Sequence, residues 1–84
     1  MTHYTPADLE MADRHIAEGE QHVARQEQIV TGLRLSGYPT QGADELLRQF
    51  NETLAIHRVH RNAIAEALQE ARWGRSAAPG YTRG

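Results

Sequence analysis

The stretch LSGYPTQG, residues 35–42, decides the fold, because it lies near the middle of 84 residues between two long segments with helical periodicity. Gly37 can take the left-handed conformation that closes a helix, and Pro39 prevents that helix from continuing. Thr40 is a capping residue, and Asp44 follows in the first turn of the next segment, where the helix dipole favours acid. The sequence therefore predicts two helices folded back on one another.

The first helix is expected over residues 6 to 36. Thr5 is a capping residue, Pro6 suits the first helical position, and Asp8 stands where a capping box has its acidic partner. Two seam positions then repeat every seven residues. The first holds Leu9, Ile16, Val23 and Val30. The second holds Ala12, Gly19, Gln26 and Leu33. This spacing is typical of a helix that packs along one partner.

The second helix is expected over residues 41 to 73, with Gly74 as its end. One of its seam positions holds Leu47, Leu54, Arg61 and Leu68, and the other holds Phe50, His57, Ile64 and Ala71. The chain is thus divided into an N-terminal arm (residues 1–5), a helical hairpin (6–73) and a tail (74–84). The composition of the tail predicts flexibility.

A pivot near residue 38 or 39 makes the numbers of facing residues add to about 77. His57 and Arg61 then interrupt the apolar seam, and Gly19 opposite them leaves room for their side chains. We interpret Gly19, His57 and Arg61 as a polar core layer that specifies pairing at some cost in stability. The acids Asp13, Glu18 and Glu20 are candidates to pair with Arg61. The alternative is an internal pocket for an anion or small ligand, formed by Arg61 and His57.

The formal charge of −2 conceals an asymmetry along the chain. Residues 1–30 carry six acids against two arginines, and residues 54–84 carry five arginines against two acids. An antiparallel fold lays these halves side by side, so we expect internal pairing and no nucleic-acid partner. The N-terminus has neither an apolar run nor a basic prelude, and no stretch reaches the ~20 apolar residues of a membrane span. We therefore expect a cytoplasmic protein without a membrane partner. The absence of cysteine excludes disulfides and thiolate metal sites.

The two flanks of the seam differ in character. One is charged, with Glu20 level with Arg58. The other, which we call the shoulder, consists of His15, His22, Ile29, Leu46, Thr53, His60 and Ala67. A two-helix hairpin cannot bury both its seam and this nearly uncharged flank. We therefore expect a homodimer, a four-helix bundle closed through the shoulder, with another protein as partner or a monomer as the alternatives. Ile56, Val59 and Ala63 lie off the seam and form an apolar strip.

Four histidines, His15, His22, His57 and His60, fall within about two helical turns of each other. Imidazole suits zinc, iron or manganese, so these four are the candidate metal ligands. The Glu-x-x-His spacing of di-iron bundles is absent. We expect histidines that pack and hydrogen-bond in an interface, with no metal and no cofactor. Such a cluster can also make dimerisation sensitive to pH between about 5 and 7.

No serine or threonine has the setting of a nucleophile, and no strand precedes a phosphate-binding loop. We therefore expect no catalytic residues and no enzymatic activity. The leading interpretation is a non-catalytic module for protein–protein interaction or oligomerisation. The alternative is a helical bundle that binds a metal or small ligand through the histidine and arginine layer.

Three strings are informative in combination with the central turn: HIAEGE at residues 15–20, ARQ at 24–26 and HRVHR at 57–61. Together with Gly37, Thr40 and Ala43, they resemble short uncharacterised helical-hairpin proteins of alphaproteobacteria. The resemblance covers most of residues 14–68. It implies a helical hairpin and a bacterial cytosol, and it transfers no site.

Overall fold

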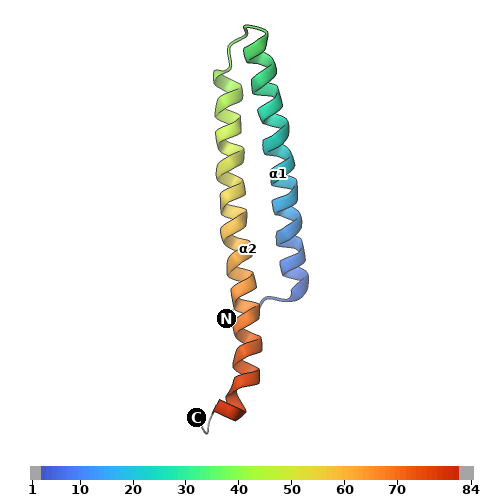
Figure 1. Ribbon diagram of the computed structural model, residues 1–84, viewed down its shortest axis with the longest axis vertical. Helices are drawn as coiled ribbons and strands as arrows, with labels where there is room; N and C mark the ends of the chain where they lie inside the picture. Colours follow the sequence, from blue (N-terminus) through green and yellow to red (C-terminus); the bar gives the residue numbers. More distant parts are fainter. Residues whose placement is uncertain (1–2, 82–84) are drawn as a thin grey trace.

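A computed structural model describes residues 3–81, with the side chains of residues 3–72. The described chain is all-α: α1 spans Pro6–Leu35 and α2 spans Gln41–Tyr81. The two helices pack antiparallel as a hairpin, and the molecule is a rod with extents of 70 × 21 × 21 Å (Figure 1). The predicted helical hairpin is confirmed.

The start of α1 is held by a capping box. The Thr5 backbone N–H donates to Asp8 Oδ2 over 2.8 Å, and the Asp8 N–H donates to Thr5 Oγ1 over 3.3 Å. Pro6 follows in the first turn, where its missing N–H costs nothing. These reciprocal bonds satisfy two backbone donors that would otherwise face solvent, so the predicted start is confirmed.

The turn closes α1 through Gly37, which has a φ of +78°. The Tyr38 N–H donates to the Leu33 carbonyl over 2.9 Å, and the Gly37 N–H donates to the Arg34 carbonyl over 3.2 Å. This pair of bonds is a Schellman motif, which requires a residue in the left-handed conformation. The sequence LSGYPTQG therefore ends α1 for the predicted reason.

The second helix starts as predicted but continues further. The Thr40 carbonyl accepts the Asp44 N–H over 2.7 Å, and the Thr40 hydroxyl donates to Asp44 Oδ2 over 2.8 Å. The helix then runs through Gly74 to Tyr81, so the predicted end near residue 73 is wrong. A single interior glycine costs only about 1 kcal/mol relative to alanine, which does not by itself end a helix. Residues 82–84 and all side chains from residue 73 onward lie outside the described part of the chain. The predicted flexibility of the tail (residues 74–84) therefore stays a prediction.

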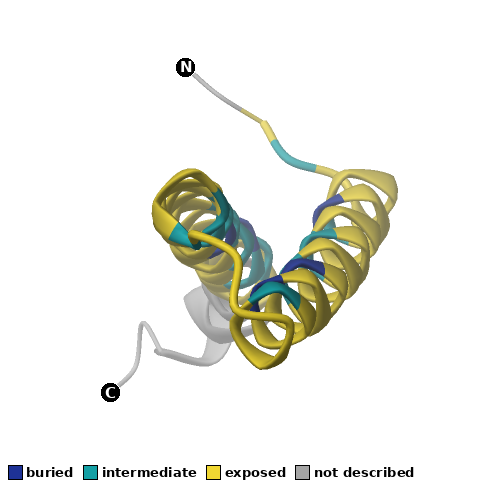
Figure 2. Ribbon diagram, turned by 90° about the horizontal axis from the view of Figure 1, so that it is seen from above, coloured by how far each residue is buried: buried dark blue, intermediate teal, exposed yellow. Residues whose placement is uncertain are grey.

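The inner faces of the helices carry the seam (Figure 2). Every predicted seam position of α1 is buried or half-buried, and so are those of α2 except Ala71, which is exposed. Ala71 differs because α2 extends beyond the start of α1, where no helix faces it (Figure 1). The buried apolar residues of the described chain are Ala12, Val30, Leu54 and Ile64.

The helices are offset from the predicted register along the seam. Gly19 faces Leu54, and an added Cβ on Gly19 would lie 3.0 Å from Leu54 Cδ1. The residue numbers of this facing pair add to 73, whereas the predicted register has facing residues that add to about 77. On the charged flank, Arg58 donates to Glu20 over 3.0 Å, and these numbers add to 78. Side chains on a helix lean toward its N-terminus, so no single sum describes every contact between antiparallel helices. The space above Gly19 therefore accommodates Leu54 and not, as expected, His57 and Arg61.

One buried polar side chain ties the two helices together near the turn. Gln26 is 6% exposed, and its Nε2 donates to the Ala43 carbonyl of α2 over 3.0 Å. Its place on the seam was predicted, but its partner was not.

Replacing Gln26 with alanine is expected to lower the free energy of unfolding by about 1–2 kcal/mol, because the hydrogen bond and the packing of its methylenes are both lost. Gln26→Leu is the matched control, since it restores the apolar volume without the hydrogen bond. Urea unfolding at one protein concentration measures both variants. A Gln26→Leu variant as unstable as Gln26→Ala would assign the stability to the hydrogen bond, whereas recovery would assign it to packing.

Over the residues that the structure describes, neither helix has an apolar segment long enough to cross a membrane.

Candidate functional site

The shoulder residues lie along one side of the hairpin, and both helices contribute to it. Of the seven, six are exposed and Ala67 is half-buried. Ile29 and Leu46, the large apolar members, are 42% and 40% exposed. Met11 extends the same side of α1 and is 51% exposed. The hairpin alone therefore leaves this apolar flank open to solvent.

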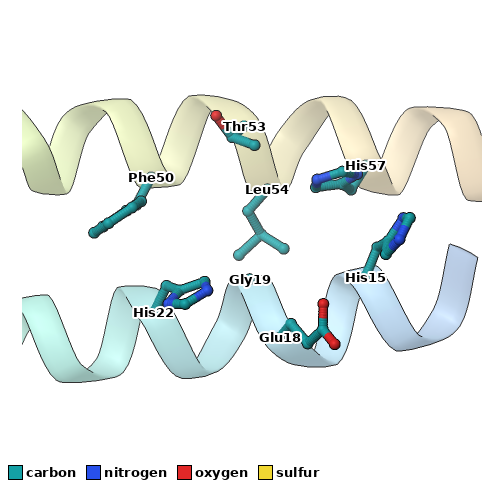
Figure 3. A pocket seen from close by; sticks show the side chains of 8 residues that line it. All are labelled: His15, Glu18, Gly19, His22, Phe50, Thr53, Leu54 and His57. Carbon is teal, nitrogen blue, oxygen red and sulfur yellow. The ribbon is translucent and has the colours of Figure 1, made fainter.

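The middle of the shoulder is hollowed between the helices (Figure 3). The hollow has a volume of about 250 Å³. Its lining comprises His15, Glu18, Gly19, His22, Phe50, Thr53, Leu54 and His57. Leu54 points across to Gly19 at its floor, so the absence of a side chain at Gly19 brings α1 and α2 together there.

The histidines on this side pack against three different rings. The ring of His22 stacks on Phe50 with centroids 5.5 Å apart, and the ring of His15 lies 5.3 Å from that of His57 at a tilt of 51°. His60 meets Tyr4 edge-on at 6.3 Å. Within the described residues, no group of three or more His, Cys, Asp or Glu side chains is arranged to hold a metal ion. His15 and His57 lie together, but His22 and His60 pack against other rings, so the four candidate ligands do not converge on one point.

The N-terminal arm lies against one end of the shoulder. The chain before Pro6 crosses from α1 toward α2 (Figure 1), which places Tyr4 against His60. A second hollow of about 230 Å³ lies beneath it, lined by residues that include Met11, His60 and Ile64. The sequence pattern predicts no role for the arm. The signal was Tyr4, a large aromatic residue just before the helix cap, but an isolated residue has no periodicity that indicates its partner.

The predicted polar layer is not a closed core layer. The Nε of Arg61 donates to Asp13 Oδ1 over 2.8 Å, and the Arg61 side chain is 38% exposed. Asp13 was one of three acids predicted as its partner. His57 turns to the opposite side, toward His15. Arg61 and His57 therefore leave the seam in opposite directions, and the two do not line a common pocket for an anion.

The charged flank contains three ion pairs between the helices. Arg58 with Glu20 confirms the predicted facing pair, Arg61 with Asp13 is the second, and Arg34 lies 3.8 Å from Asp44 near the turn. Two of the pairs join the acidic first part of the chain to the basic later part. Because these side chains are largely exposed, each pair is worth only ~0.2–1 kcal/mol.

The outer face of α2 carries the predicted apolar strip. Ile56 and Val59 are 67% and 70% exposed, and Ala55, Ala63 and His60 border the same shallow surface. His60 also belongs to the shoulder. The exposed apolar surface of α2 is therefore continuous from the shoulder to its outer face.

A solvent-exposed charge cluster near the start of α2 shifts two pKa values. The hydrogen bond from Arg48 lowers the pKa of Glu45, and Gln49 adds to this effect. Glu45 in turn raises the pKa of Arg48, which also pairs with Glu52 one turn later. This cluster lies within one helix, so it supports the helix itself and not the shoulder.

Comparisons of the chain with protein-family models, with curated proteins and with solved structures found no match. The resemblance to alphaproteobacterial hairpin proteins and the cytoplasmic location stay predictions.

Proposed function

We propose that this chain is a non-catalytic oligomerisation module whose working form is a homodimer, a four-helix bundle closed through the shoulder. The observation that carries the proposal is the exposure of Ile29 and Leu46 on the nearly uncharged shoulder, with exposed Met11 beside it. Among the described residues, just four apolar side chains are buried. A second copy on the shoulder would bury what the seam leaves open.

The surface of the chain supports a partner of substantial size. The accessible surface is 6571 Å², whereas a compact monomer of 9.4 kDa would expose about 5,000 Å². The radius of gyration is 19.9 Å, against about 12 Å for a compact domain of this length. The accessible surface beyond that of a compact monomer is larger than the roughly 800 Å² that each partner contributes to a stable interface. A second copy of the same rod can cover that area along its whole length.

Sedimentation equilibrium tests the proposal directly. We expect a mass near twice 9.4 kDa at tens of micromolar protein, with dissociation on dilution. A mass of one chain throughout that range would refute the homodimer. In that case a different protein would be the occupant of the shoulder, and the purified chain would remain monomeric until that protein was added.

A further inference from the structure

The two helices present different chemistry beside the shoulder. On α2 the neighbouring surface is the apolar strip, with Ile56 and Val59 more than two-thirds exposed. On α1 the corresponding surface carries Met11, Glu18 and Arg25, which are exposed and spaced seven residues apart. Neither of these charges forms an ion pair within the described part of the chain. The α2 side of the shoulder is therefore apolar, whereas the α1 side carries two charges without an ion-pair partner beside Met11.

A two-fold dimer through the shoulder has two possible arrangements. With both turns at the same end, α1 of each copy lies on α2 of the other. Glu18 and Arg25 then face the apolar strip, and burying a charge without a partner is costly. With the turns at opposite ends, α1 lies on α1 and α2 lies on α2. The apolar strip then meets its own copy, and the charged surface meets its own copy in the reverse direction.

The reverse direction also supplies the missing ion pairs. In an antiparallel pair of identical helices, residues equally far from the two-fold axis face each other. An axis near His22 therefore brings Glu18 of each copy to Arg25 of the other. Across the seam, Gly19 packs on Leu54. His22 of α1 and Thr53 of α2 line the same hollow above this contact. An axis that passes near His22 therefore also passes near Thr53.

From these observations we infer that the homodimer is assembled with its turns at opposite ends, α2 against α2 and α1 against α1, with the two-fold axis near His22 and Thr53. The inference rests on the proposed dimerisation and adds its direction and register. It makes the apolar strip part of the interface, with a second copy of α2 as its occupant.

Cross-linking of single-cysteine variants tests the arrangement, because the natural chain contains no cysteine. Thr53→Cys, His22→Cys and the control Leu35→Cys are each treated with a short bismaleimide at a concentration where sedimentation shows a dimer. Leu35 is 83% exposed and lies at the turn, away from the proposed axis. We expect Thr53→Cys and His22→Cys each to link to its own copy at least tenfold faster than Leu35→Cys.

A mixture of the Thr53→Cys and His22→Cys proteins distinguishes the two arrangements. If the turns lie at the same end, His22 faces Thr53 of the second copy, so the mixed product would dominate and each variant alone would react no faster than the control. That result, or rates equal to the control in every sample, would overturn the inference while sedimentation still reported a dimer. A monomer in sedimentation would instead refute the proposed function itself.

Discussion

Replacing Leu54 with alanine is expected to lower the free energy of unfolding by about 2–5 kcal/mol, the range measured for buried leucines in other proteins. Leu54 is 4% exposed and is the side chain that fills the space above Gly19. Its loss removes the apolar contact that α2 makes with Gly19 of α1. For a chain that buries so little, this cost is a large share of the total stability. Urea unfolding followed by circular dichroism measures it.

A substitution at Gly19 provides the matched control. An added methyl would lie 3.0 Å from Leu54 Cδ1, so Gly19→Ala gains about 1 kcal/mol of helix propensity but displaces Leu54. In a Leu54→Ala background the displacement disappears, and Gly19→Ala should then be stabilising by roughly that full amount. Equal effects of Gly19→Ala in the two backgrounds would show that Leu54 does not pack on Gly19. All four proteins are compared at one concentration, because dimerisation adds to apparent stability.

Replacing Ile29 with glutamate is expected to weaken dimerisation by at least a hundredfold. Ile29 lies on the shoulder and is 42% exposed in the hairpin. In a two-fold dimer the substitution acts twice, and each carboxylate would be taken out of water without a partner. The helices of the hairpin itself should remain, since Ile29 is not on the seam. Sedimentation equilibrium gives the dissociation constant, and circular dichroism gives the helix content.

Leu35→Glu is the control for that experiment. It places the same charge on the same helix, at a residue that is 83% exposed and off the shoulder. We expect its dissociation constant to stay within a few-fold of that of the natural chain. Unchanged dimerisation of Ile29→Glu, or equal weakening by both variants, would place the interface elsewhere on the hairpin.

Most of the hairpin was predictable because its signals are local. The capping box of Thr5, the left-handed Gly37 and the seven-residue spacing each depend on neighbours within one or two turns. The end of α2 was not predictable from Gly74, because one glycine weakens a helix by about 1 kcal/mol without supplying a competing structure. The exposure of Ala71 has a tertiary cause, since it depends on where α1 begins.

The candidate site was predictable as a surface but not as a set of contacts. The helical repeat placed His15, His22 and Ile29 on one flank of α1, and the structure leaves all three exposed there. It did not indicate that His22 stacks on Phe50 or that Tyr4 meets His60 edge-on. Ring contacts between elements depend on the distance and offset of the helices, which no local pattern contains.

The sequence by itself determined two helices, their turn, the seam and the division into a charged and an uncharged flank, because periodicity and capping are properties of each segment alone. The tertiary structure decided that Gly19 receives Leu54, that Arg61 pairs with Asp13, and that His57 turns toward His15. These choices depend on the distance between α1 and α2 and on their axial offset. Several such offsets satisfy the repeat, and side-chain packing selects one of them.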